Sequence, residues 1–94
     1  MNKYELVFIL EPMLDASAQK KEIDKIEKLI TSLKGKVKKK EVWGKKILVY
    51  PIKKFKEGIY IQFDFNFPTE NIKEWESKMK LEEKIIRHLL IRRE

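Results

Sequence analysis

A chain of 94 residues suits one compact domain, residues 1–94, and its 43% apolar residues are enough to form a hydrophobic core. The absence of cysteine excludes a disulfide framework and a thiolate metal site, and it fits a reducing, cytoplasmic setting. The net charge of +7 is uneven, because residues 34–56 contain ten lysines and one acid, a local charge of +9. Positive charge concentrated in this way indicates a binding partner that is a polyanion.

The first elements of the chain predict a strand followed by a helix. Tyr4–Leu10 is apolar on both faces after its second residue, which is typical of a central strand. Asp15 or Ser17 is expected to cap the helix, whose apolar residues recur at helical spacing. Gly35 is expected to end this helix as its C-terminal glycine.

The basic segment predicts a long hairpin. Lys36–Trp43 and Lys45–Ile52 form an extended arm, with a bulge or bend at Gly44. We expect the turn at Lys53–Gly58 and a clean two-residue alternation over Ile59–Phe67, where the odd-numbered residues are apolar. The arm and this strand would therefore pair with each other.

The last third predicts a second helix and a fourth strand. Thr69 is the expected cap of the helix, and Ile85–Arg92 is the strand; the residues on the buried face of the helix are Ile72, Trp75 and Met79. The order β-α-β-β-α-β predicts an α+β, ferredoxin-like sandwich. In this fold a four-stranded antiparallel sheet carries both helices on one face, and the first and third strands are central.

The sheet face without helices is a candidate surface for a partner protein. It is expected to display Val7, Ile9, Ile47, Val49 and Tyr60, together with Gln62. An apolar face of this kind usually binds a protein or stacked bases. Alternatively, the stems of long lysine side chains cover it.

Six cations are candidates for phosphate contact: Lys3, Lys45, Lys46, Arg87, Arg92 and Arg93. The two adjacent lysines accompany Trp43 and Gly44, and the three arginines, which can contact phosphate bidentately, all lie in or just after the last strand. The arginines could instead form a C-terminal charge tail. Lys38–Lys40 have two open roles, either phosphate contact or protection of an edge strand against aggregation.

The sequence does not support catalysis or a cofactor. His88 is the one histidine and is flanked by leucines, so a packed histidine is favoured over a base or a metal ligand. No phosphate-binding glycine motif is present, and no apolar run reaches the roughly 18 residues of a membrane span. Gly58–Phe63 does not match the aromatic RNP1 pattern, which disfavours generic base stacking and leaves backbone and shape recognition open.

Four segments resemble the bacterial small-subunit ribosomal protein six family over nearly the whole chain. They are the opening Lys3-Tyr4-Glu5 with Glu11-Pro12, the run Gly44–Lys53 that contains Leu-Val-Tyr-Pro-Ile-Lys, the piece Gly58-Ile59-Tyr60, and the ending Ile85–Leu90. Two residues depart from the family pattern: Ile47 stands where a polar or basic residue is usual, and Val49 where alanine or serine is usual.

The resemblance implies a ferredoxin-like fold without catalysis, in a cytoplasmic ribosomal protein. It also implies binding to the central domain of small-subunit rRNA together with ribosomal protein eighteen. In this picture Lys3, Lys45, Lys46, Arg87 and Arg92 face the RNA, and Arg93 is a further candidate. Tyr50 and Leu48 are expected to be structural, because they share the core-facing parity of Ile52.

Two other classes of function remain open at the level of sequence. The first is a regulatory or protein-interaction module of the same fold that self-associates through the open sheet face. The second is a hydrolase similar to acylphosphatases, for which the sequence lacks the phosphate-binding loop.

Overall fold

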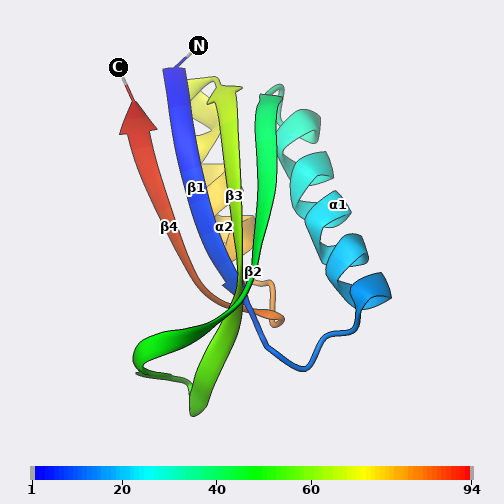
Figure 1. Cartoon of the computed structure of the whole chain (residues 1–94). Helices are drawn as coiled ribbons and strands as arrows, with labels where there is room; N and C mark the ends of the chain where they lie inside the picture. Colours follow the sequence, from blue (N-terminus) through cyan, green and yellow to red (C-terminus); the bar gives the residue numbers. More distant parts are fainter. Residues whose placement is uncertain (1, 94) are drawn as a thin grey trace.

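The computed structural model describes residues 2–93 and confirms the ferredoxin-like sandwich. The strands are β1 (Asn2–Leu10), β2 (Lys36–Ile52), β3 (Phe55–Phe67) and β4 (Ile85–Arg93), and they form one antiparallel sheet in the order β2-β3-β1-β4. The helices are α1 (Ala16–Ser32) and α2 (Ile72–Met79), the latter preceded by the 3₁₀ turn η1 (Thr69–Asn71). Figure 1 shows α2 behind the strands and α1 beside β2, and residues of both helices pack into the same core on one face of the sheet. No helix among the described residues is long and apolar enough to cross a membrane.

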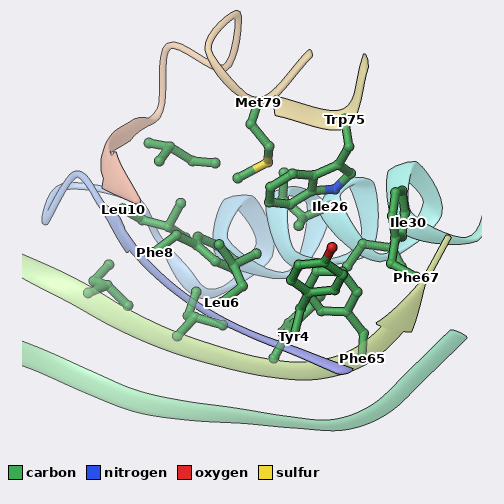
Figure 2. Close-up of a cluster of buried hydrophobic side chains, with 14 residues drawn as sticks. Tyr4, Leu6, Phe8, Leu10, Ile26, Ile30, Phe65, Phe67, Trp75 and Met79 are labelled. Carbon is green, nitrogen blue, oxygen red and sulfur yellow. The ribbon is translucent and has the colours of Figure 1, made fainter. Parts of the chain in front are cut away.

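The main core lies between the sheet and the two helices. The even residues of β1 and the odd residues of β3 point into it, because side chains alternate across a strand. Figure 2 shows Trp75 of α2 above this layer, next to Ile26 and Ile30 of α1. Trp75 is fully buried and packs its ring against Phe65 and Phe67. The predicted periodicities therefore identified the core.

The ends of the helices agree only partly with the prediction. Asp15 caps α1, since its Oδ1 accepts a hydrogen bond of 2.7 Å from the backbone N–H of Ala18. The left-handed residue after α1 is Lys34, with a φ of 71°, and not Gly35. The prediction for Thr69 was wrong, because Thr69 lies inside η1 and caps neither helix with its side chain.

The turn of the long hairpin is shorter than predicted. Strand β3 begins at Phe55, so the turn is only Lys53 and Lys54, with φ values of 50° and 71°. Two successive positive φ values are typical of the two-residue turns whose twist matches that of paired strands. As a result, the hairpin of β2 and β3 extends beyond the ends of β1 and β4, as Figure 1 shows, and we call this extended part the arm.

Strand β2 leaves the regular pairing at two places that matter for the site. The expected bulge is confirmed at Gly44, which has a φ of 89° and lies at a register shift. A larger shift follows, since Ile47 lies opposite Glu57 while Ile52 lies opposite Phe55. The residues between Ile47 and Ile52 therefore bow out from β3, and strand parity no longer predicts where their side chains point.

A second, smaller hydrophobic cluster covers part of the sheet face opposite the helices. Leu48 packs there on Ile9 and Ile86, and all three are buried. The open face is thus partly covered by the chain's own arm. The sequence had suggested either a binding partner or the stems of lysine side chains as the cover. Tyr50 is 63% exposed, so the expectation that it shares a core-facing parity with Leu48 and Ile52 was wrong.

Candidate nucleic-acid and protein interface

The sheet face opposite the helices carries an apolar groove next to the second cluster. The groove encloses about 300 Å³ and is lined by Val7, Ile9, Leu48, Val49, Tyr50, Ile52, Tyr60, Arg87, His88 and Leu89. Four of the five residues predicted for a partner-protein face line it. Ile47 is the exception, and it lies on the outside of the arm with 80% of its surface exposed.

The residues predicted for the partner-protein face differ widely in their exposure to solvent. Ile9 is only 7% exposed, because Leu48 packs over it, whereas Val49 is 97% exposed at the rim. Leu89 and Ile91, which the sequence analysis did not single out, add exposed apolar surface on β4. The signal for them was present in the sequence, since they alternate with the core-facing residues of the last strand.

A second depression, of about 550 Å³, lies at the far end of the same face. It is lined by Lys3, Tyr4, Glu5, Lys38, Asp64, Phe65, Asn66 and Arg93. Lys3 and Arg93 lie opposite each other across β1 and β4, so the structure brings these two predicted cations together. Arg93 forms an ion pair with Glu5, which reduces the charge available to an anion.

The predicted cations of β4 do not point the same way. Arg87 lies opposite Ile9 and is exposed on the face with the apolar groove. Arg92 lies opposite Tyr4, whose side chain belongs to the main core, so Arg92 belongs to the side of the sheet that carries the helices. The six cations therefore form separate groups and not one patch.

Lys45 and Lys46 lie on the exposed arm beside an aromatic pair. The rings of Trp43 and Tyr60 are stacked, with 6.4 Å between centroids and an interplanar angle of 12°. The Lys46 Nζ lies 5.3 Å from the centroid of Trp43 and 5.9 Å from that of Tyr60. These distances are within the range of cation–π contacts.

A hydrogen-bonded chain along the edge strand orients Trp43. The Trp43 Nε1 donates a hydrogen bond of 3.0 Å to the Glu41 carboxylate. The Glu41 carboxylate also forms an ion pair with Lys39, with 2.8 Å between the two charged atoms. The hydrogen bonds from Lys39 and from Trp43 lower the pKa of Glu41. Sequence reasoning noted Trp43 beside the lysines but missed its contact with Tyr60, which depends on how β2 and β3 are paired.

The remaining lysines of β2 are occupied by acids of the chain itself. Lys40 pairs with Glu27 of α1 at 2.8 Å, and Lys39 pairs with Glu41. Lys38 differs, since it lines the second depression, together with Lys3 and Arg93. Pairing with internal acids on an edge strand supports the protective role for Lys39 and Lys40 over direct phosphate contact.

His88 is half-buried and packs edge-on against Trp75, with 6.3 Å between ring centroids. Burial lowers its pKa, while Glu76 acts in the opposite direction. Among residues 2–93, no group of three or more side chains is placed to hold a metal ion. His88 is thus a packed residue next to the core.

Comparisons with known proteins agree with this geometry. The family model described as ribosomal protein S6 matches residues 3–92. The small ribosomal subunit protein bS6 of Dictyoglomus turgidum is 39% identical over 96% of this chain and 93% of its own length. The bS6 protein of Clostridium acetobutylicum is 40% identical over 97% of this chain and 96% of its own.

A solved structure is similar along almost the entire chain. The crystal structure of 30S ribosomal protein S6 from Thermotoga maritima has a TM-score of 0.93 and 32% sequence identity, and the match covers 98% of this chain and 87% of that one. The relatives are ribosomal proteins and not enzymes. The chain therefore belongs to the ribosomal protein S6 family.

Proposed function

We propose that this small-subunit ribosomal protein binds the central domain of small-subunit rRNA together with ribosomal protein eighteen. As a ribosomal protein it works in the cytoplasm, and its role in this proposal is to hold RNA and a neighbouring protein in a fixed arrangement. No small-molecule substrate or cofactor takes part.

The observation that carries the proposal is the division of one surface into an apolar groove and a cationic arm. The groove contains Tyr60 and Leu89 with few charges, a composition that suits the centre of a protein interface. Lys45 and Lys46 lie on the arm and have no acidic partner among the described residues, so their charge is available to phosphate. We assign the groove to ribosomal protein eighteen and the arm to the RNA.

The other cations have graded roles in this proposal. Arg87 lines the groove and is exposed, which suits a phosphate that approaches the boundary between RNA and protein. Lys3 and Arg93 share the second depression, but Arg93 is partly neutralised by Glu5. Arg92 belongs to the opposite side of the sheet and would contact a different part of the RNA.

Replacing the two arm lysines tests the assignment of the RNA site. We expect Lys45→Ala with Lys46→Ala to weaken binding to a central-domain rRNA fragment and to reduce the slope of log affinity against log salt by about 1.5, because each phosphate contact releases counterions. Affinity is measured over a range of salt concentrations, with and without ribosomal protein eighteen. Lys20→Ala with Lys21→Ala removes the same charge from the exposed surface of α1 and should change the slope much less.

Three outcomes would contradict parts of the proposal. A flat salt response of the original protein, with and without ribosomal protein eighteen, would exclude phosphate binding. A loss of thermal stability in the arm variant with unchanged RNA affinity would make the two lysines structural. A tight homodimer in sedimentation, closed through the apolar groove, would favour the self-associating module.

A further inference from the structure

Trp43 combines a fixed orientation with an accessible ring. Tyr60 stacks on one side of the indole, and Glu41 accepts a hydrogen bond from its Nε1. The side chain nevertheless remains 41% exposed, whereas Trp75 is fully buried. An indole held in this way loses little conformational freedom when it binds a ligand.

The distances show that Lys46 and Tyr60 leave the outer side of the indole uncovered. The Lys46 Nζ is closer to each ring centroid, at 5.3 and 5.9 Å, than the centroids are to each other, at 6.4 Å. If the Lys46 ammonium group lay on the side of Trp43 that faces away from Tyr60, its distance to the Tyr60 centroid would exceed the 6.4 Å between the two ring centroids. Lys46 therefore lies beside the aromatic pair, and neither it nor Tyr60 covers the outer ring face.

The backbone explains why the indole is on this surface. Val42 lies opposite Ile61 and Gly44 lies opposite Tyr60, so Trp43 is the extra residue of the bulge. Continuing this pairing without a bulge would have placed Trp43 directly opposite Tyr60, on the same face of the sheet. With the bulge, Gly44 takes the position opposite Tyr60, and Trp43 is an unpaired residue whose ring stacks beside that of Tyr60 on the adjacent strand.

We propose that Trp43 stacks against an unpaired base of the rRNA, whose neighbouring phosphates bind Lys45 and Lys46. This inference rests on the proposed function, because it specifies what the arm recognises. Every base has an aromatic face, and stacking on a side chain requires that the base is not paired within a helix. A ring flanked by free cations therefore fits one nucleotide of a loop or bulge.

The charge around the indole favours RNA over a protein as the occupant. Lysine is depleted at the centres of protein interfaces, while a cationic groove with exposed aromatic rings is the usual combination for single-stranded nucleic acid. The carboxylate that accepts the hydrogen bond from the indole, that of Glu41, is already paired with Lys39. The arrangement differs from the RNP1 pattern, since one of the two rings comes from the edge strand β2.

Fluorescence of the full-length protein tests the inference, because a stacked base quenches an exposed indole and cannot reach the buried Trp75. The probes are the central-domain rRNA fragment with ribosomal protein eighteen, a short oligoadenylate, and an RNA duplex. We expect quenching with the first two probes and much less with the duplex. Trp43→Leu should abolish this response and weaken binding of the rRNA fragment about 5- to 100-fold.

Trp43→Phe is the matched control, because phenylalanine keeps a flat ring while leucine keeps only apolar bulk. Its affinity should lie between those of the original protein and Trp43→Leu, and all three should melt at similar temperatures. Equal affinities of the three proteins, equal quenching by the duplex, or quenching by ribosomal protein eighteen without RNA would each overturn the stacking inference. The phosphate site would still be tested separately by the arm lysines, whose effect is read from the salt slope.

Discussion

Gly35 and Gly44 are both needed by the fold, for different physical reasons. A Cβ on Gly35 would lie 2.4 Å from Phe67 and 2.7 Å from Ile30, so this position requires close packing. A Cβ on Gly44 would meet nothing within 4 Å, but its φ of 89° disfavours any other residue. Sequence reasoning found both positions, yet it could not separate these causes, because the first depends on contacts between distant residues.

Alanine at each glycine should therefore produce different signatures. Gly35→Ala should cost about 1–3 kcal/mol by overpacking the core, and Gly44→Ala about 1–2 kcal/mol through backbone strain. Chemical denaturation measures both losses. Only Gly44→Ala should also change the emission of Trp43, whose orientation depends on the bulge. Full stability of Gly35→Ala would show that Phe67 and Ile30 can move apart without cost.

At the scale of elements, the arm contains most of the differences between expectation and structure. Its strands were predicted correctly as extended and paired, because their composition and alternation are local properties. The bow between Ile47 and Ile52 was not predicted, since it depends on which residues of β3 are opposite. One consequence is that Leu48 is buried while Tyr50 is exposed, although both were expected to face the core.

The two-residue turn at Lys53-Lys54 carries strain that can be removed. Both lysines have positive φ, and the residues preferred in such a turn are asparagine and glycine. We expect Lys53→Asn with Lys54→Gly to stabilise the protein by about 0.5–1 kcal/mol, measured by denaturation at high salt. The control is Lys53→Ala with Lys54→Ala, which removes the same charges but keeps the strain. Equal stabilisation by the alanine pair would point to charge repulsion instead.

At the scale of the whole molecule, two carboxyl groups meet where α1 contacts the turn between α2 and β4: Glu22 of the helix and Glu82 of the turn. Glu22 is only 5% exposed, and its Oε2 has no hydrogen-bond partner. Burial raises the pKa of Glu22 to about 7, and the nearby carboxyl of Glu82 contributes to the increase. Lys25 holds Glu82 at 2.9 Å and opposes this effect. The contact therefore couples the stability of the fold to pH.

The sign of this coupling follows from proton binding. The folded state keeps the Glu22 proton up to about pH 7, while the unfolded chain releases it near its ordinary pKa of 4.5. Stability should thus fall as the pH rises through this window, by on the order of 1–3 kcal/mol. Below about pH 6.5, the lowered pKa of His88 acts in the opposite direction, since its protonation disfavours the folded state.

Melting curves between about pH 4.5 and 8 test this coupling, and comparison with Glu22→Gln at each pH removes the contribution of His88, which both proteins share. Glu22→Gln, which is neutral at every pH, should gain stability relative to the original protein as the pH rises to about 7 and should melt at a higher temperature at pH 8. The matched control is Glu27→Gln, on the same helix but in an exposed pair with Lys40, which should keep the original slope. A parallel decline of Glu22→Gln and the original protein would exclude Glu22 as the cause.

The sequence by itself determined the order of the elements, the residues of the main core, the concentration of positive charge and the resemblance to the S6 family. These properties are read from local periodicity, composition and short motifs. Only the tertiary structure decided that Leu48 closes a second cluster, that the six cations divide among separate groups, and that Trp43 stacks on Tyr60. The physical reason is that each of these depends on the register between strands, and a bulge of one or a few residues changes which side chains share a face.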